Sequence, residues 1–318
     1  MNSEMELDRM RQKCIGCGRC TEVCPSYKHG GCDPREIMLG SDDDINLCIS
    51  CGKCSQICRR LDPARIIQTL ILIREGKTLP ATFHETGYVL PYGDTDVPEP
   101  AWNGDDICIM PGCIVKCKVP FIENASAESI KSLGYTCKEI PVSTCCTHPI
   151  VCRELSEMEC RNVKKKMESS AEGSKIVTLC GGCNDEMLNT DIESRHMIQF
   201  LFDNIDSLPQ TKKKMKVALE PGCSAEKYIK QMIAVVEKMG FEYVRNEYGC
   251  CGKNIDMAEE MMQIRQEAAK DADAIVVGCP MCFVKYDSFP DGKTVLHIGE
   301  LVSIANGDES SLAYHKIK

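Results

Sequence analysis

The feature that most constrains this chain of 318 residues is an internal repeat, which begins at residue 105 and has a period of roughly 105 residues. In each half a short apolar run ends in Pro-Gly-Cys, first at Cys113 and again at Cys223. A helix-like stretch, a short strand and two adjacent cysteines follow, and then a charged helix and an apolar run that closes on CxxC. This order of strand, helix, strand, helix and strand predicts two repeated Rossmann-like α/β units with parallel sheets. Because the two halves share the same order of motifs, we expect a pseudo-twofold to relate them, with their cysteine-bearing strand ends facing each other.

The cysteines of the repeat follow the predicted strands directly. Ligands of open α/β sheets gather at the carboxyl ends of the strands, where the next helices direct their N–H groups outward. That field lowers the pKa of a thiol and favours anionic sulfur. Five thiolates in each half exceed what a zinc ion or a single cubane takes. The two sets are Cys113, Cys145, Cys146, Cys180 and Cys183, and then Cys223, Cys250, Cys251, Cys279 and Cys282.

Two pairs of these cysteines are adjacent in the chain, Cys145 with Cys146 and Cys250 with Cys251. Neighbouring Cα atoms lie about 3.8 Å apart, which is below the roughly 4.4–6.8 Å that disulfides prefer. Two adjacent thiolates can instead bind two different atoms of one polynuclear metal cluster. The pairs are therefore candidate metal ligands rather than disulfides.

Two further cysteine runs near the amino terminus share the spacing CxxCxxCxxxC. This spacing is typical of paired 4Fe-4S cubanes in bacterial-type ferredoxins, in which the fourth cysteine of each run binds the other cluster. A zinc site would need neither four cysteines per run nor two identical runs. One departure is Arg59, which stands after Cys58 where proline is usual. The predicted ligand sets are Cys14, Cys17, Cys20 and Cys58 for one cubane, and Cys48, Cys51, Cys54 and Cys24 for the other.

These patterns divide the chain into four parts. Residues 1–76 are expected to form an N-terminal two-cluster ferredoxin-like α-helical domain, which ends in an apolar helix at 62–76. Residues 77–104 are rich in Pro, Gly and Asp and are expected to be a linker. The two α/β units then occupy 105–210 and 211–318.

Composition excludes several classes of function. The chain has 24 cysteines, and its amino terminus is charged and lacks the apolar segment of a signal peptide. Metal binding in a reducing cytoplasm is therefore expected, rather than a disulfide scaffold. A formal charge of −9 and only 5% aromatic residues argue against nucleic acid as a partner. No apolar run is long enough to span a bilayer. The chain is therefore expected in the cytoplasm, where it could still dock peripherally on a membrane subunit.

The motifs "PGC", "CCG" and "CPMC", with "VLHIGELV" near the end, resemble the landmarks of the cysteine-rich CCG domain of heterodisulfide reductase. The amino-terminal region is similar to the ferredoxin-like subunit of the same enzyme. The resemblance spans nearly the whole chain, as a fusion of the two subunits. The first repeat departs from the pattern with "CCTH" in place of CCG, and the second repeat has shorter spacings around its cysteine pair.

The resemblance implies an oxidoreductase that acts on a disulfide, fed by two cubane clusters. Each five-cysteine set would hold a noncubane 4Fe-4S cluster, the second repeat being the less regular of the two. The disulfide would be cleaved between the two sets, which makes Cys145, Cys146, Cys250 and Cys251 the candidate catalytic residues. His148 could donate a proton to a departing thiolate, or could serve only as a cap or hydrogen-bond partner.

The family's substrate is the mixed disulfide of coenzymes M and B in methane-forming archaea. The implied partner is an electron-donating flavoprotein or a membrane-bound cytochrome b, within a larger complex. Two alternatives remain open from the sequence. The chain could be an electron-relay iron–sulfur subunit of a quinone-linked dehydrogenase, or an accessory electron donor that activates another metalloenzyme.

Six cysteines fall outside these sets and are expected to be small buried side chains. Cys117 is the exception, because it lies one helical turn beyond Cys113 and could touch a cluster. Lys253 follows the second cysteine pair and could neutralise an anionic substrate, or could be merely solvated. The six are Cys32, Cys108, Cys117, Cys137, Cys152 and Cys160.

Overall fold

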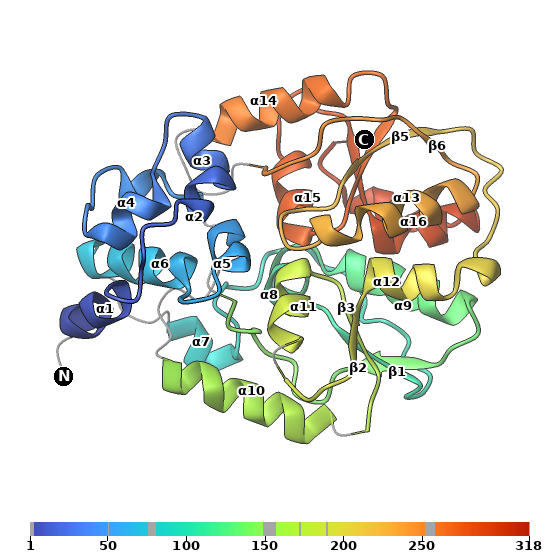
Figure 1. Ribbon diagram of the computed structural model, residues 1–318. Helices are drawn as coiled ribbons and strands as arrows, with labels where there is room; N and C mark the ends of the chain where they lie inside the picture. The colour runs from blue at the N-terminus through green and yellow to red at the C-terminus, as the bar shows by residue number, and fades with distance from the viewer. Residues whose placement is uncertain are drawn as a thin grey trace.

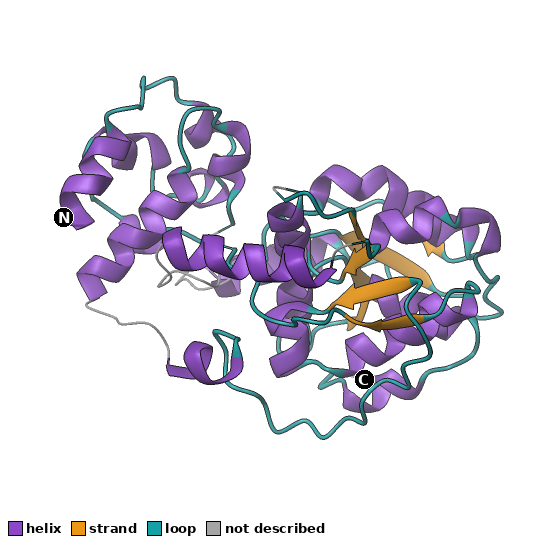
Figure 2. Cartoon of the chain, turned by 90° about the horizontal axis from the view of Figure 1, so that it is seen from below, coloured by secondary structure: helices purple, strands orange, loops and turns teal. Residues whose placement is uncertain are grey.

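The computed structural model describes residues 3–49, 51–75, 81–148, 157–171, 173–188, 190–251 and 258–317. A helical amino-terminal domain lies beside a larger α/β body, and Figure 2 shows the two as separate lobes. The helices of the first lobe are α1 (Ser3–Arg11), α2 (Arg19–Glu22), α3 (Pro25–Lys28), α4 (Pro34–Leu39), η1 (Ile45–Leu47), α5 (Lys53–Ile57) and α6 (Pro63–Glu75).

The predicted apolar helix of the amino-terminal lobe is α6, which confirms that part of the sequence analysis. Ile66, Ile67 and Ile71 lie on one side of it at helical spacing and are buried against Leu7 and Ile37. Cys14 and Cys48, the first cysteines of the two runs, pack against this small core. Residues 77–104, the expected linker, include a short helix, α7 (Ala81–Thr86).

The α/β body contains two four-stranded sheets with the same connectivity (Figure 1). The elements of the first repeat are β1 (Ile107–Met110), α8 (Gly112–Lys118), α9 (Phe121–Ser132), β2 (Cys137–Glu139), α10 (Glu157–Ala171), β3 (Ile176–Thr178), α11 (Gly181–Met187), β4 (Ser194–His196), α12 (Met197–Asp203) and η2 (Ile205–Ser207). Those of the second are β5 (Lys216–Glu220), η3 (Glu226–Tyr228), α13 (Ile229–Lys238), β6 (Glu242–Tyr243), α14 (Ala258–Ala268), β7 (Ala274–Val277), α15 (Pro280–Tyr286), β8 (Thr294–His297), α16 (Ile298–Ala305) and η4 (Ser310–Tyr314).

The strand orders are β2-β1-β3-β4 and β6-β5-β7-β8, and every pairing is parallel. The predicted fold class is therefore confirmed. In each sheet the second strand of the repeat lies on one side of the first strand, and the third strand lies on the other side. The direction in which strands are added therefore reverses between β1 and β3, and between β5 and β7. Such a switch point is where α/β sheets bind ligands. Met110 pairs with Thr178 there, and Glu220 pairs with Val277.

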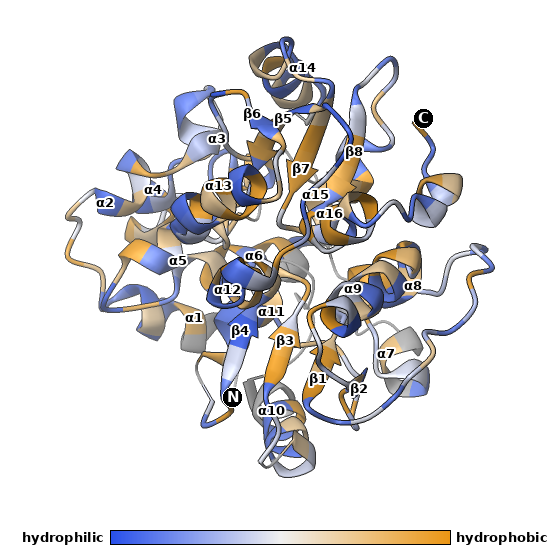
Figure 3. Ribbon diagram, turned by 90° about the vertical axis from the view of Figure 1, so that its right-hand side faces the viewer, coloured by the Kyte–Doolittle hydropathy of each residue, from blue (hydrophilic) through white to orange (hydrophobic). Residues whose placement is uncertain are grey.

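The central strands are buried and strongly apolar, as Figure 3 shows for β1, β3, β5 and β7. The two repeats pack against each other reciprocally: α9 of the first contacts α16 of the second, and α12 contacts α13. Ser129 Oγ donates to the Gly299 carbonyl at 2.6 Å, and Ser303 Oγ donates to the Ala125 carbonyl at 3.1 Å. This exchange gives the pair the pseudo-twofold arrangement that the repeated sequence predicts.

Among the helices described here, none is both long and apolar enough to cross a membrane.

Candidate functional site

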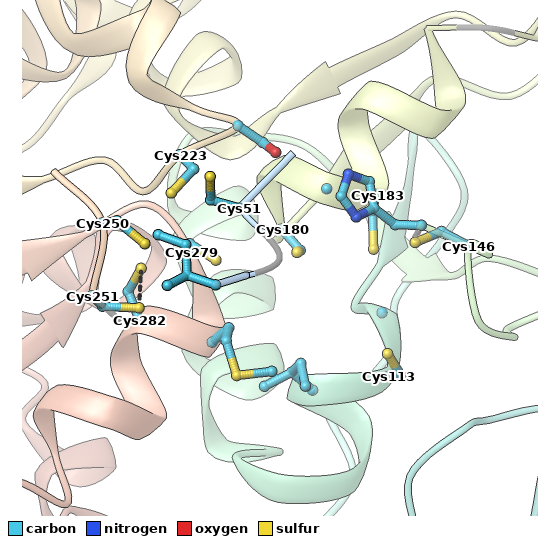
Figure 4. Close-up of a pocket in the computed structure, with 17 residues that line it drawn as sticks. Cys51, Cys113, Cys146, Cys180, Cys183, Cys223, Cys250, Cys251, Cys279 and Cys282 are labelled. Atoms are coloured by element: carbon cyan, nitrogen blue, oxygen red, sulfur yellow. Dashed lines mark hydrogen bonds between the residues drawn. The ribbon is translucent and has the colours of Figure 1, made fainter. Parts of the chain in front are cut away.

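The carboxyl ends of the two sheets face one cavity, which lies between the repeats and beside the amino-terminal lobe (Figure 4). Nine of the ten repeat cysteines line it, together with Cys51 of the amino-terminal lobe. The predicted facing arrangement of the two cysteine sets is thereby confirmed. The lining cysteines are Cys51, Cys113, Cys146, Cys180, Cys183, Cys223, Cys250, Cys251, Cys279 and Cys282.

The remaining repeat cysteine, Cys145, lies directly beside this cavity. Its Sγ is 4.0 Å from that of Cys113. Its backbone N–H donates to the Gly87 carbonyl at 2.9 Å, so the segment after α7 helps to fix the position of the pair. In the second repeat, Cys251 Sγ lies 3.5 Å from Cys282 Sγ.

The Pro-Gly-Cys turns are built alike in the two repeats. Gly112 and Gly222 have φ of +76° and +82°, which side chains rarely adopt. A Cβ at Gly112 would lie 2.6 Å from Cys183 Sγ, and one at Gly222 would lie 2.6 Å from Cys279 Cβ. Glycine is therefore required here both for the turn and for the close approach of the CxxC cysteines.

The first cysteine of each CxxC motif is the N-cap of the helix that follows. Cys180 precedes α11 and Cys279 precedes α15, with nearly identical backbone angles. Their thiols meet across the boundary between the repeats. The contact between Cys180 and Cys279 therefore connects the switch point of one sheet with that of the other.

Hydrogen bonds depress the pKa of a thiol in each repeat. Hydrogen bonds from Cys145 and Cys183 lower the pKa of Cys146 well below its usual value. Hydrogen bonds from Cys180 and Cys282 do the same for Cys279. Neighbouring thiols and burial raise the pKa values of Cys183 and Cys282 instead, so the negative charge in each set is concentrated on one of these hydrogen-bonded thiols. The thiolate is the form that binds metals.

The four thiols predicted to hold the first cubane line one cavity of the amino-terminal lobe, Cys14, Cys17, Cys20 and Cys58. The end of the second run therefore comes beside the first run, as crossed ligation requires. Four thiols around one cavity are the donor set of an iron–sulfur cluster, so the residues present fit that group.

The second predicted cubane set is linked to the α/β body. Cys51 is buried with its thiol in contact with that of Cys223 in the second repeat. Nearby, Lys53 of α5 pairs with Glu226 at 2.5 Å. The thiol of Cys32 lies between those of Cys24 and Cys48, which the sequence analysis did not anticipate. In the described ranges, no group of three or more His, Cys, Asp or Glu side chains converges on a single metal-ion position.

The structure also places His148 and several cysteines that were expected to lie outside the cluster sets. His148 is buried and lines the cavity, where its ring packs against Gly182. Cys117 does not line the cavity, because its side chain points into the core beneath it, and Cys108 and Cys137 are also buried in cores. Lys253, Cys152 and the side chain of Cys160 lie outside the described residues.

Three buried polar residues behind the cavity were not predicted from the sequence. Burial raises the pKa of Glu220 to about 8, against the backbone N–H of Gly249 and the Arg265 guanidinium. Cys251 adds to this rise, so a protonated carboxyl lies near the second cysteine pair. His196 and His297 end β4 and β8 and cap the next helices through their Nδ1 atoms. The repeated pattern His-x-x-Gln/Glu, typical of a capping box, could have identified both.

Comparison with known proteins agrees with this geometry. Residues 10–62 match the 4Fe-4S dicluster domain, and residues 217–286 match the cysteine-rich CCG domain. One subunit of the ferredoxin/F420H2-dependent CoB-CoM heterodisulfide reductase of Methanosarcina acetivorans is 24% identical, over 62% of this chain and 87% of the relative. The equivalent subunit of the ferredoxin:CoB-CoM heterodisulfide reductase of Methanosarcina mazei is 22% identical over the same shares.

Two further likenesses extend over more of the chain. One subunit of the fumarate reductase (CoM/CoB) of Methanothermobacter marburgensis is 21% identical over 93% of this chain, which spans 62% of that relative. The crystal structure of a hypothetical protein from Helicobacter pylori superimposes with a TM-score of 0.51 at 10% identity, over all of this chain and 76% of that one. It supports the fold alone.

The fold and the cysteine sites define an iron–sulfur protein that joins a 4Fe-4S dicluster domain to a CCG domain. The resemblance to the heterodisulfide reductase family, expected from the cysteine motifs, is confirmed.

Proposed function

We propose that the chain is the iron–sulfur catalytic subunit of a heterodisulfide reductase-like enzyme, which reduces a small-molecule disulfide of the CoM-S-S-CoB type in the cavity between its repeats. The observation that carries the proposal is the single cavity lined by cysteines from both repeats and by Cys51. A disulfide that lies between two cysteine sets can be engaged at both of its sulfur atoms.

The clusters would be held by four sets of thiols. The crossed amino-terminal sets end in Cys58 and Cys24, and each repeat contributes its own five cysteines. When bound, the clusters would supply electrons one at a time and iron sites with affinity for sulfur. The ten thiols beside one cavity match the donors that two noncubane clusters need, which supports this assignment.

The other residues of the cavity suit a disulfide substrate. Ile49, Ile114 and Met281 line it and would exclude water from the sulfur atoms. The reduction RS–SR + 2 e⁻ + 2 H⁺ → 2 RSH consumes two protons. His148 lies at the first cysteine pair, and the Glu220 carboxyl lies near the second, where burial keeps it protonated at neutral pH. His148 lines the cavity and Glu220 lies behind it near Cys251, so a proton source would stand near each cysteine pair.

Electrons would enter through the amino-terminal lobe. The contact between Cys51 and Cys223 is the point at which a predicted cubane ligand meets a repeat cysteine. The second repeat is therefore the entry point, and the first repeat lies beyond it. The relatives' names describe subunits of reductases, which supports a larger complex. Its electron donor would be a flavoprotein or a membrane-bound cytochrome b.

The test is reduction of the mixed disulfide of coenzymes M and B by anaerobically purified protein, with a reduced viologen dye as donor. Cys145→Ser and Cys250→Ser should each lose this activity, because a hard oxygen ligand suits a thiolate position poorly. Both should keep the amino-terminal clusters. Cys137→Ser is the matched control, since this buried cysteine lies off the cavity and its hydroxyl could bond the Ala127 carbonyl as the thiol does.

Relay of electrons without substrate chemistry is the second candidate, favoured by the relative from fumarate reductase that matches 93% of the chain. An electron relay can still work when a ligand of its last cluster is changed, whereas a site that breaks a bond cannot. Unchanged disulfide turnover in both serine variants would therefore leave the relay function, or an accessory electron donor, as the better account.

A further inference from the structure

The cavity of the first predicted cubane opens on a strongly basic face of the amino-terminal lobe. Four arginines and no acidic side chain line it. Arg19, Arg59 and Arg60 are exposed, and within the described ranges none of the three makes an ion pair. Such a concentration of free positive charge is unusual on a chain whose net charge is −9.

The fourth arginine organises the backbone of this face. Arg35 Nε donates to the Gly16 carbonyl at 3.0 Å, and its guanidinium pairs with Glu36 at 3.2 Å. It thereby holds the turn that presents Ile15 and Cys17. This turn is the wall of the cavity, so the basic face and the cluster ligands are parts of one rigid unit.

Apolar side chains are exposed among these charges. Ile15 is 63% exposed, Leu39 is 51% exposed and Ile57 is 37% exposed. Cys17, a predicted cluster ligand, is exposed beside them. An apolar centre with arginines around it is the composition of a protein interface rather than of a solvated surface.

We propose that this arginine face, formed by Arg19, Arg35, Arg59 and Arg60 around Ile15, Ile57 and Leu39, docks an acidic one-electron carrier protein. The inference rests on the proposed function in one respect, namely that electrons enter through the amino-terminal clusters. The carrier's carboxylates would pair with the free guanidinium groups, and its cofactor would come close to the exposed Cys17 and the cluster held beside it.

The charges favour a small protein over a membrane as the occupant. At physiological salt, charges act over about 8 Å, so a carrier that covers only this face meets the arginines and not the remaining acidic surface. An extended anionic membrane would also approach the acidic remainder of a chain with net charge −9.

The experiment measures binding of a gallium-substituted, redox-inert acidic ferredoxin by titration calorimetry, and reduction of the clusters by the native reduced ferredoxin in stopped flow. We expect Arg59→Gln/Arg60→Gln to weaken binding and slow reduction by about tenfold or more at about 0.01 M ionic strength, where the Debye length is about 30 Å. At about 1 M salt the difference should vanish. Reduction by a viologen dye should stay unchanged, which shows that the clusters are intact.

Lys212→Gln/Lys214→Gln is the matched control, because it removes two exposed positive charges in the segment before β5. Equal binding by wild type and the arginine variant, or an equal loss in the lysine control, would overturn the proposal. So would arginine-dependent binding to vesicles of anionic phospholipid in the absence of ferredoxin binding. Neither readout uses the disulfide. Failure of disulfide turnover with intact, arginine-dependent ferredoxin binding would therefore refute the proposed function and support the arginine face.

Discussion

His297, in the second repeat, donates a hydrogen bond from Nε2 to the backbone carbonyl of Leu179, in the first repeat, at 3.0 Å. Its Nδ1 accepts from the Gly299 N–H, so the ring is neutral with the proton on Nε2, and burial lowers its pKa accordingly. His196, the equivalent residue of the first repeat, lies near Gly278 of the second repeat, but its buried Nε2 atom has no hydrogen-bond partner among the described residues. Leu179 and Gly278 immediately precede the first cysteine of the two CxxC motifs. The second repeat therefore helps to position the metal-binding turn of the first.

His297→Phe should lower the stability of the protein by about 2–4 kcal/mol, because it leaves two buried backbone groups without partners. His297→Asn should cost less, since asparagine can still cap α16 while it loses the bond to Leu179. The measurement is the thermal midpoint by circular dichroism under anaerobic conditions, with iron per chain as a second readout. A phenylalanine variant that melts like wild type would show that the cross-repeat bond contributes nothing.

The glycines of the Pro-Gly-Cys turns give a second prediction. Gly112→Ala and Gly222→Ala should each reduce the iron bound per chain by up to one cluster, because the added Cβ would displace Cys183 or Cys279. Positive φ alone would cost only about 1 kcal/mol. Gly134→Ala is the control, because Gly134 has φ of +90° with nothing within 4 Å of an added Cβ. Equal iron content in all three variants would exclude crowding of the cysteines.

Crossed ligation gives a third prediction. Cys58→Ser should disturb the same cluster as Cys14→Ser and spare the one disturbed by Cys48→Ser, because Cys58 lines the cavity of Cys14, Cys17 and Cys20. Low-temperature electron paramagnetic resonance of the reduced variants would distinguish the two clusters. The opposite pairing, with Cys58→Ser and Cys48→Ser altering one signal, would contradict the crossing.

The repeated motifs were sufficient to predict both parallel sheets and the meeting of their cysteines. Parallel strands end at the same edge, and a repeat related by a pseudo-twofold brings two such edges together. The fourth strands, β4 and β8, are too short for a periodic pattern, and unlike β1, β3, β5 and β7 they are not followed by a cysteine motif that would have marked them. The histidine caps that follow them were the available signal.

The contacts between distant segments could not be predicted. Cys51 meets Cys223 only because the amino-terminal lobe docks on the second repeat, and no local pattern encodes that docking. Glu220 belongs to an apolar run, so its buried carboxyl was hidden within a predicted strand. Cys32 was expected to be a small core side chain, and it is buried, yet its thiol also lies between two predicted ligands.

A pH-dependent effect is expected from Glu123, which is buried in α9 beside Lys116. Burial, and then the charge of Glu139, raises its pKa from 4.5 to about 7 despite Lys116. Below about pH 4.5 both the folded and the unfolded states are protonated. Between about 4.5 and 7 the unfolded state releases the proton that the folded state keeps, so stability falls as the pH rises.

Glu123→Gln removes this penalty, so the variant should gain stability over wild type at about pH 8 and much less at about pH 5. The gain at the higher pH is on the order of 1–3 kcal/mol, and the thermal midpoints at the two pH values measure it. Glu128→Gln is the control, because Glu128 is an exposed carboxylate of the same helix. Equal gains at both pH values would contradict the assignment of this pKa.

The last prediction concerns the ion pair between Lys53 and Glu226, which joins the amino-terminal lobe to the second repeat beside Cys51 and Cys223. Lys53→Glu places two carboxylates together and should loosen this contact, which would slow the passage of electrons from the amino-terminal clusters to the cavity. Glu226→Gln should have a small effect, because a partly exposed pair is worth only about 0–1 kcal/mol.

The measurement is the rate at which pre-reduced amino-terminal clusters are reoxidised after mixing with the disulfide, followed by freeze-quench electron paramagnetic resonance. Reduction of the same clusters by a dye is the control and should not change. The double variant Lys53→Glu/Glu226→Lys restores an attractive pair and should restore the rate, which a general loss of folding would not allow. If Lys53→Glu reoxidises as fast as wild type, electrons do not enter the cavity through the contact between Cys51 and Cys223.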